Sequence, residues 1–322
     1  MQLLKIGVLR GGPSREYEVS LKTGQNIINN LPIDKYNVED IYISREGIWY
    51  RDGLPTTPLD ALRGIDVIIN GLHGDFGEDG RVQRIMDGIG IPYTGSKAFG
   101  ATNSINKDFA KGRYKKNYLK TPEHVTFRGN EEDVKKIALD LFRNFPQPSI
   151  IKPVYGGSSK DVYYCDSYQK IFDAIDTLSK KNEPFLIEEY IKGKEASVSV
   201  LEDFRDEDLY AFPPTEIGKT SPFFSYEQKY NGVPREVFTP GSFTFEEKEM
   251  LKELAREAHD SLDLRQYSQS DFIVSPRGIY ILETNALPGL TETSILPEVL
   301  QSVGLNLPLF LDHIINLSLK GK

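Results

Sequence analysis

The sequence predicts an α/β protein, α+β in part, with two or three domains. At 322 residues the chain is long enough to bury more than one hydrophobic core. Near the N-terminus, the apolar residues 6–9 precede a Gly-Gly-Pro-Ser turn and a helical pattern, which is the order of a strand, a glycine turn and a helix. Near the C-terminus, two apolar runs at residues 271–274 and 279–282 flank a Ser-Pro-Arg-Gly turn, and we expect a β-hairpin there.

The composition is that of an ordinary soluble globular protein, with 39% hydrophobic and 27% charged residues. A net charge of −8 at pH 7 provides no basic field for nucleic acid or an anionic membrane, so a phosphorylated substrate would need local positive charge or a metal ion. No apolar run reaches membrane-spanning length, and the N-terminus enters a strand directly instead of showing a signal-peptide pattern. We expect a cytoplasmic protein whose single cysteine, Cys165, serves packing.

Residues 1–100 are expected to form an N-terminal α/β domain. Its strands should cover residues 6–9, 38–43, 48–50 and 67–70, and its helices residues 16–30 and 81–88. His73 lies in the loop that follows strand 67–70, at the sheet edge where open α/β sheets bind ligands. A histidine that caps this loop structurally is an equally good interpretation.

Residues 101–190 are expected to form a second, central domain. A helical pattern over residues 101–118 carries Lys107 and further lysines, most of which we assign to a solvated helix face. Strand 149–153 contains Lys152 and is followed by Tyr-Gly-Gly-Ser-Ser-Lys. The backbone amides of this loop are suited to wrap phosphate oxygens, unless the segment is a simple hairpin tip. The other expected elements are strands 161–165 and 184–191 and helix 168–180.

Residues 191–322 are expected to form the third domain, with a strand at 196–201 and helices at 245–261, 297–303 and 307–320. Residues 213–240 show almost no periodicity, and loops of this length in compact proteins are usually functional lids or disordered. Aromatic residues in this segment favour a lid that closes over a site. They are Phe223, Phe224, Tyr226 and Tyr230.

The expected hairpin brings acidic and amide side chains together. If its loop is the three residues Pro-Arg-Gly, Ser275 pairs with Ile279, and Asp271 lies opposite Glu283. Asn285 then shares the face of Glu283, because side chains alternate along a strand. A two-residue loop would place the two carboxylates on opposite faces, so the register decides whether a site exists.

Two carboxylates at cross-strand distance repel each other, and a hard divalent cation between them removes the repulsion. Oxygen ligands suit Mg²⁺ (or Mn²⁺), and Mg²⁺ usually completes its shell with substrate phosphates. We therefore favour a metal site at Asp271, Glu283 and Asn285 over the alternative of ordinary surface charge at a strand end.

Several motifs follow one another along the chain in the order seen in one enzyme family. GGPSREYEVSLKTG, GLHGDFGEDG, GIPYTGS, IIKPVYGGSS, EEYIKGKEASV, SYEQKY, SDFIV and ILETNALPGLTETS together resemble D-alanine–D-alanine ligases of the ATP-grasp superfamily, across essentially the whole chain. The resemblance implies a three-domain ATP-grasp architecture with an N-terminal parallel α/β domain, and ATP held between the other two domains. It also implies ATP-dependent ligation of two D-alanines through an acyl phosphate, for peptidoglycan synthesis.

The resemblance also implies roles for individual residues. Asp271, Glu283 and Asn285 match the family's Mg²⁺ ligands. The residues implied to bind ATP are Lys107, Lys152, Ser158, Ser159, Glu188, Glu189, Tyr190, Ile191, Glu195 and Lys229. The residues implied to act on the amino acids are Glu18 for the first ammonium, His73, the lid latch of Ser158 and Tyr230, Gln269, Gly289 as an oxyanion donor, and Ser294 for the second carboxylate.

Two positions depart from the family pattern. Gln269 stands where family members usually carry an arginine that holds the transferred phosphoryl group. Losing one electrostatic stabiliser of this kind costs on the order of 3 kcal/mol, or about 10²-fold in rate. Asp161 replaces a glycine of the glycine-serine loop, and we expect it to alter the loop geometry.

These departures keep three functions open. We favour an active D-alanine–D-alanine ligase, with reduced activity. The alternatives are an ATP-grasp ligase for a different amino or hydroxy acid, and a catalytically impaired nucleotide-binding paralogue. The resemblance further suggests a homodimer whose other partners are the small molecules ATP and D-alanine, without nucleic acid or membrane.

Overall fold

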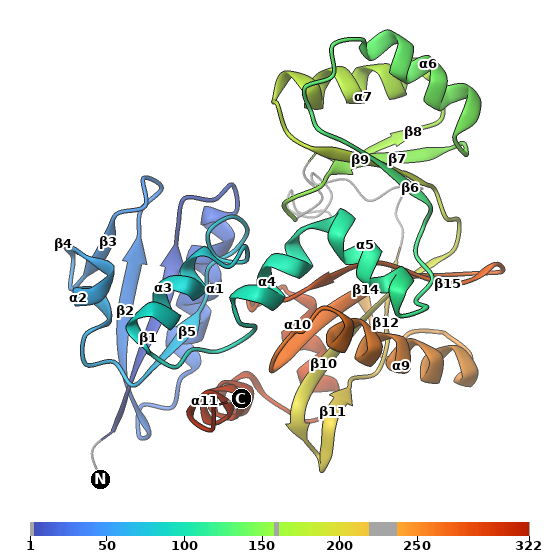
Figure 1. The fold of residues 1–322 in the computed structure, drawn as a ribbon. Helices are drawn as coiled ribbons and strands as arrows, with labels where there is room; N and C mark the ends of the chain where they lie inside the picture. The colour runs from blue at the N-terminus through green and yellow to red at the C-terminus, as the bar shows by residue number, and fades with distance from the viewer. Residues whose placement is uncertain (1–2, 158–160, 219–236, 322) are drawn as a thin grey trace.

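Three separate sheets organise the chain in the computed structural model, which describes residues 3–157, 161–218 and 237–321 (Figure 1). The first sheet uses residues 4–70, the second residues 124–189 and the third residues 194–285. Each of the three expected domain ranges therefore contains one sheet. None of the helices in the described ranges has both the length and the apolar character needed to cross a bilayer.

The N-terminal sheet contains a parallel core. Its strands are β1 (Leu4–Gly11), β2 (Tyr36–Ile43), β3 (Trp49–Arg51), β4 (Leu54–Thr56) and β5 (Val67–Asn70), and the helices beside it are α1 (Tyr17–Asn30), α2 (Pro58–Leu62) and α3 (Arg81–Ile89). The strand order is β4-β3-β2-β1-β5, and β1 pairs in parallel with both β2 and β5. The carboxyl ends of β1 and β5 lie side by side, and the loops that follow them both line a pocket described below.

The helix expected over residues 101–118 is two helices, α4 (Ala98–Ile105) and α5 (Lys107–Lys116). Asn106 separates them, because its backbone is extended and its side-chain oxygen accepts a hydrogen bond of 3.0 Å from Phe109 N as the N-cap of α5. The prediction of one helix is wrong because asparagine favours such a local bond over a place inside a helix. The break places Lys107 in the first turn of α5.

The central sheet is antiparallel and has its own core. Its strands are β6 (His124–Phe127), β7 (Ser149–Pro153), β8 (Tyr163–Cys165) and β9 (Phe185–Glu189), in the order β6-β9-β7-β8. Helices α6 (Val134–Asn144) and α7 (Tyr168–Lys180) cover one face of this sheet (Figure 1). Cys165 is buried between that face and the helices, as expected for a packing residue.

The third sheet carries the hairpin. Its strands are β10 (Lys194–Phe204), β11 (Glu207–Ala211), β12 (Thr215–Ile217), β13 (Val237–Phe238), β14 (Tyr267–Ser275) and β15 (Gly278–Asn285), and its helices are α9 (Phe245–Ser261), α10 (Ile295–Ser302) and α11 (Leu307–Leu319). The strand order is β13-β12-β10-β14-β15, with β11 also paired to β10. The expected lid, residues 213–240, begins with β12 and ends with β13. Its aromatic residues Phe223, Phe224, Tyr226 and Tyr230 lie outside the described residues.

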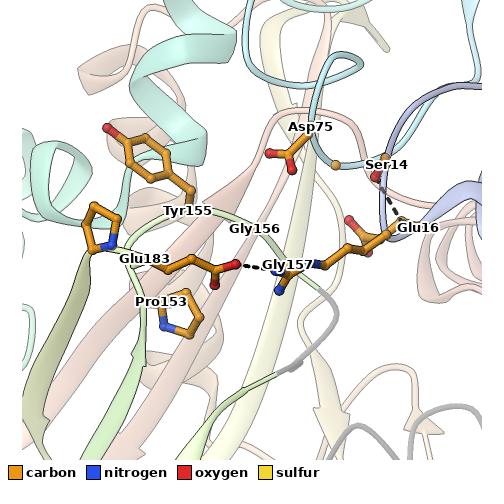
Figure 2. A pocket seen from close by; sticks show the side chains of 11 residues that line it. Ser14, Glu16, Asp75, Pro153, Tyr155, Gly156, Gly157 and Glu183 are labelled. Atoms are coloured by element: carbon orange, nitrogen blue, oxygen red, sulfur yellow. Dashed lines mark hydrogen bonds and ion pairs between the residues drawn. The ribbon is translucent and has the colours of Figure 1, made fainter. Parts of the chain in front are cut away.

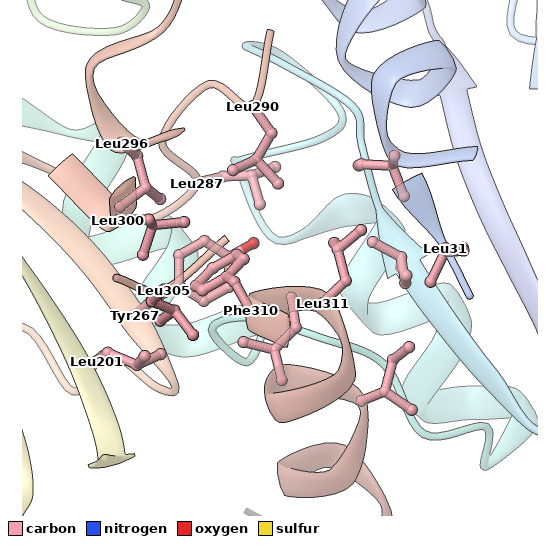
Figure 3. Packing of buried hydrophobic residues seen from close by; sticks show 14 of the residues in the cluster. Leu31, Leu201, Tyr267, Leu287, Leu290, Leu296, Leu300, Leu305, Phe310 and Leu311 are labelled. Carbon is pink, nitrogen blue, oxygen red and sulfur yellow. The ribbon is translucent and has the colours of Figure 1, made fainter. Parts of the chain in front are cut away.

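One hydrophobic core joins the first and third sheets (Figure 3). Ile27 and Leu31 contribute to it from the N-terminal domain, and Tyr267 contributes from β14. The C-terminal helix α11 lies between the two sheets, and the ring of its Phe310 packs edge-on against Tyr267 at 5.3 Å between centroids. The N-terminal and C-terminal parts of the chain are therefore packed together, whereas the central sheet has a separate core.

Candidate active site

Asp271 and Glu283 lie directly opposite each other on β14 and β15. The sequence predicts this pairing, and the structure confirms it. The expected reason for it is wrong, however. The hairpin loop has two residues and not three, because Ser275 pairs with Gly278 instead of with Ile279. A regular two-residue hairpin would have placed the two carboxylates on opposite faces.

A β-bulge restores the register. Phe272 pairs with Ile281, whereas Asp271 pairs with Glu283, so Leu282 is an extra residue on β15. A bulge sets two residues of one strand against one residue of its neighbour. The extra residue therefore turns Glu283 back to the face that carries Asp271.

An amide pair continues this face. Gln269 lies opposite Asn285, two residues along each strand from the carboxylate pair, so all four side chains share one side of the sheet. Asn285 is exposed, and its Oδ1 accepts a hydrogen bond of 2.8 Å from Leu287 N. The expected grouping of two carboxylates and an amide on one face is therefore present.

Neighbouring groups fix the two carboxylates. Ser197 on β10 donates a hydrogen bond of 2.7 Å to Asp271 Oδ1, and Lys107 Nζ lies 3.7 Å from Glu283 Oε2. Lys107 Nζ also donates to the carbonyl oxygen of Gly156, in the loop after β7. In the described ranges no three His, Cys, Asp or Glu side chains cluster as a metal-ligand set, so a cation here would use two carboxylates and an amide. This oxygen-only donor set fits Mg²⁺ or Mn²⁺.

A small apolar cluster lies beside the carboxylates. Ile273 and Tyr280 are cross-strand neighbours on β14 and β15, and Leu282 packs against them. Ile191 joins this cluster from the segment that links β9 to β10. Glu195 on β10 lies opposite Ile273 and therefore on the same face. An apolar surface bordered by carboxylates suits a ligand with a flat base and polar substituents.

Two buried lysines share one buried carboxylate in the central domain. Glu188 Oε1 lies 2.6 Å from Lys152 Nζ, and Glu188 Oε2 lies 2.8 Å from Lys111 Nζ. Lys111 also donates a hydrogen bond of 2.8 Å to Thr121 Oγ1. Lys107 precedes Lys111 by one helical turn on α5, so this helix carries lysines to the acidic groups of both sheets.

Burial and charge act in opposite directions on these groups. Burial lowers the pKa of Lys111 to about 8. Burial alone would raise the pKa of Glu188, but the ammonium groups of Lys111 and Lys152 outweigh it and lower that pKa to about 2. Burial alone would lower the pKa of Lys152, but nearby carboxylates, Glu188 first among them, outweigh it and raise that pKa above its ordinary value. The carboxylate and the two ammonium groups thus stabilise one another's charged forms against the cost of burial.

The neighbour of Glu188 points elsewhere. Glu189 Oε2 accepts a hydrogen bond of 2.9 Å from Arg277 Nη1 at the hairpin tip, and Glu189 Oε1 accepts one of 3.3 Å from Glu123 N. Successive residues of a strand face opposite ways, so the Glu189 side chain ties the central sheet to the hairpin and does not join the lysine cluster. The ring of Tyr190 packs edge-on against Tyr164 at 5.2 Å between centroids.

A pocket of about 180 Å³ lies between the turn after β1 and the loop after β7, and Glu16 lines it (Figure 2). A Cβ atom at Gly74 would lie 2.7 Å from Glu16 Oε2, so the loop after β5 passes close to this carboxylate. Glu18 does not line the pocket. It lies in the exposed first turn of α1 and pairs with Arg45 at 2.7 Å. Glu16, two residues before Glu18, is therefore the acidic residue of this turn that lines the pocket, and the substrate contact implied for Glu18 stays a prediction.

His73 is held on both ring nitrogens by the N-terminal domain. Nε2 lies 2.8 Å from Thr23 Oγ1, and Nδ1 lies 3.2 Å from Glu78 Oε1. The side chain is buried, with 5% of its surface exposed. Of the two interpretations offered by the sequence, these contacts favour a histidine that fixes the loop after β5.

Gly289 and Ser294 lie next to each other before α10. A Cβ atom at Gly289 would lie 2.8 Å from Ser294 Oγ, so a larger residue would displace this hydroxyl. Ser294 Oγ also lies 2.7 Å from Thr291 Oγ1 and accepts a hydrogen bond of 3.1 Å from Thr291 N. The remaining predicted site residues, Ser158, Ser159, Lys229 and Tyr230, lie outside the described residues.

Comparison with known families identifies the family of this chain. A family model described as "D-ala D-ala ligase C-terminus" matches residues 114–316, and one described as "D-ala D-ala ligase N-terminus" matches residues 5–61 and 53–96. The chain belongs to the D-alanine–D-alanine ligase family.

Relatives of this ligase match it over nearly their whole length. D-alanine–D-alanine ligase B of Clostridium perfringens is 33% identical, over 99% of both chains, and D-alanine–D-alanine ligase of Desulfotalea psychrophila is 34% identical, over 99% of this chain and 97% of its own. Among solved structures, the VanG D-Ala:D-Ser ligase of Enterococcus faecalis has a TM-score of 0.84 at 28% identity, covering 98% of this chain and 100% of its own. The Bacillus anthracis D-alanine–D-alanine ligase complexed with ATP has a TM-score of 0.82 at 26% identity, covering 100% of this chain and 98% of its own.

The ligase accommodates Asp161 without losing the backbone conformation that favours glycine. Asp161 has φ of +57°, in the left-handed region, which aspartate tolerates better than most residues. Its carboxylate lies 2.5 Å from Lys181 Nζ and 3.3 Å from Arg15 Nη1, and Arg15 also pairs with Glu183. The departure at Asp161 thus adds an ionic contact between the N-terminal and central domains of this ligase.

Two neighbours of the candidate site are not among the residues that the sequence predicts for it. Lys111 belongs to a group of lysines of which most are expected on a solvated helix face, but it is completely buried. A signal was available, because Lys111 stands between Lys107 and the apolar Tyr114 at the spacing of one helix face. Ser197 gave no signal of its own, since a serine in a strand acquires a role only through the residue opposite it.

Proposed function

We propose that this ligase joins two D-alanines to D-alanyl-D-alanine, with ATP as the phosphoryl donor. The observation that carries the proposal is the meeting of two sheets at one site. Asp271 and Glu283 come from the third sheet, Lys152 comes from the central sheet, and Lys107 on α5 lies against both. Acidic groups for a metal ion and basic groups for phosphates at one junction are what binding of a metal–nucleotide complex requires.

We assign Asp271, Glu283 and Asn285 to Mg²⁺, and Lys107 and Lys152 to the phosphates of ATP. Bound Mg²⁺ would neutralise charge on the phosphates during transfer. The apolar cluster of Ile191, Ile273, Tyr280 and Leu282, with Glu195 on the same face, is suited to the nucleoside. A structural neighbour, the Bacillus anthracis ligase, was solved in complex with ATP, which supports ATP as the nucleotide of this site.

The amino acids would occupy the space between the N-terminal loops and the metal face. Glu16, which lines the pocket, would hold the ammonium group of the first D-alanine, whose carboxylate accepts the phosphoryl group. The amine of the second D-alanine then attacks this acyl phosphate, and phosphate leaves. Gly289 would stabilise the developing oxyanion through its N–H, and Ser294, before α10, would bind the second carboxylate.

Phosphate release with ATP, Mg²⁺ and D-alanine tests this function. We expect turnover that disappears with EDTA and returns with added Mg²⁺, and D-alanyl-D-alanine as the product. Absence of turnover at millimolar D-alanine, with ATP binding intact, would favour a nucleotide-binding paralogue that has lost catalysis.

A second substrate other than D-alanine is the other candidate function. The VanG D-Ala:D-Ser ligase resembles the structure as closely as the D-alanine ligases do. A panel of D-alanine, D-serine and D-lactate as second substrates separates the two functions by kcat/KM. If kcat/KM is higher for D-serine or D-lactate than for D-alanine, the product is not D-alanyl-D-alanine but D-alanine joined to that substrate.

Size-exclusion chromatography with light scattering tests the predicted homodimer, and fractionation of cells tests the predicted cytoplasmic location.

A further inference from the structure

Lys111 lies behind Glu188 as seen from Lys152, which we assign to the phosphates of ATP. Lys111 is too deeply buried to touch a nucleotide itself. None of its surface is exposed, and its ammonium group is enclosed by Glu188 Oε2 and Thr121 Oγ1, each at 2.8 Å. A buried lysine is costly unless it is paired, so its position calls for a function. The pairing with Glu188 suggests what that function is.

Glu188 forms ion pairs with two lysines and not with Lys152 alone. Its two carboxylate oxygens are divided between two ammonium groups, Oε1 with Lys152 and Oε2 with Lys111. The three side chains together carry one net positive charge. Without Lys111, the pair of Glu188 and Lys152 would be neutral, and Lys152 would be held by the carboxylate at 2.6 Å. The positive charge of Lys152 toward phosphate thus depends on a lysine behind it.

We propose that Lys111 is a positioning residue that offsets the charge of Glu188, so that Lys152 is available to the phosphates of the nucleotide. The protein as a whole is acidic, with a net charge of −8, so a phosphate site needs a local excess of positive charge. In a buried site one elementary charge acts strongly, because the effective dielectric constant is far below that of water. The inference rests on the proposed function, since it concerns the same ATP site.

The substitution K111M tests the proposal, because methionine keeps the length of the side chain and removes its charge. Dissociation constants for adenosine, ADP and ATP are measured with the full-length protein by competition against a fluorescent nucleotide. We expect the constant for ATP to rise about 10- to 100-fold in K111M, that for ADP to rise less, and that for adenosine to stay within about twofold. A purely structural role would weaken adenosine and ATP equally, and this result would overturn the proposal, as would an unchanged constant for ATP.

Two further variants sharpen the test. K115M removes the same charge from α5 at an exposed position, where Lys115 pairs with Glu123, and we expect wild-type affinities. K111M/E188Q removes the carboxylate together with the lysine and returns the net charge to that of Lys152 alone. In this double variant the ratio of the dissociation constants for adenosine and ATP should return toward the wild-type ratio. If K111M fails to fold, this double variant is the one that tests the proposal. A double variant that folds but still lacks this preference contradicts the proposal.

The same measurements separate this inference from the proposed function. Wild-type protein that does not bind ATP with Mg²⁺ refutes the proposed function. Wild-type protein that binds ATP, together with a K111M variant of the same affinity, refutes only the role of Lys111.

Discussion

Asp271 faces Glu283 because Leu282 is an extra residue in β15 that compensates for the two-residue hairpin loop. The carboxylates are brought together where the ladder is irregular, and Ser197 and Lys107 hold one of them each. Bulges are frequent near active sites, where they aim a side chain that a regular ladder would turn away. The third sheet therefore presents two facing carboxylates at the candidate site.

The substitutions D271N and E283Q should each remove most of the thermal stabilisation by Mn²⁺ and ATP. A ligand at 100 times its dissociation constant stabilises a protein by about 2.7 kcal/mol, and this gain is lost when the ligand no longer binds. Without ligand, the melting temperature should be unchanged or higher, because one of two facing negative charges is gone. Differential scanning fluorimetry measures the melting temperature with and without the ligands.

The control is E249Q, at an exposed position of α9 where Glu249 pairs with Lys252. Full stabilisation of E283Q by Mn²⁺ and ATP would exclude Glu283 as a ligand.

The substitution Q269R should raise kcat by about 10²-fold. Gln269 lies opposite Asn285 on the face of the carboxylate pair, where a positive charge would stabilise the transferred phosphoryl group. Q269K supplies the charge without the planar fork of arginine, so a smaller gain is expected. Steady-state phosphate release with D-alanine gives the comparison. If neither variant gains activity, the missing arginine is not what limits this ligase.

The pair E16Q and E18Q tests which acidic residue of the N-terminal turn binds substrate. A hydrogen bond to a charged group contributes about 2 kcal/mol, so E16Q should lower kcat/KM for the first D-alanine by roughly 30-fold. E18Q should stay within about twofold, because Glu18 is exposed and pairs with Arg45. Initial rates over a range of D-alanine concentrations distinguish the two variants. A larger loss in E18Q than in E16Q would reverse the assignment.

The buried Glu188 should make the folded protein sensitive to acid. Its folded pKa of about 2 lies below the ordinary value of 4.5, so its contribution is complete above about pH 4.5 and is lost as the pH falls toward 2. The full shift corresponds to about 3 kcal/mol. Urea unfolding at pH 7, 5, 4 and 3 measures the free energy of unfolding. The variant K111M/E188Q lacks this carboxylate and should lose less stability below pH 4.5 than the wild type. Parallel curves for the two proteins would mean that Glu188 is not the group responsible.

The sequence by itself determines the family, most of the strands and helices, and the kinds of side chain in the hairpin. Strand 149–153 with Lys152 and the hairpin with Asp271 and Glu283 could be predicted, because each depends on residues close together in the chain, and the order of the motifs could be read directly from the sequence. Tertiary structure decides which of two nearby glutamates lines the pocket. Helix α1 begins at Tyr17, which directs Glu18 to solvent and leaves Glu16 in the pocket. The ammonium group of buried Lys111 is paired by Glu188, which comes from a different part of the chain. A bulge likewise cannot be located before both strands are paired. Helices and strands follow from local sequence patterns, because they are set by residues near one another in the chain. The orientation and pKa of a side chain depend instead on groups from distant parts of the sequence that the fold places beside it.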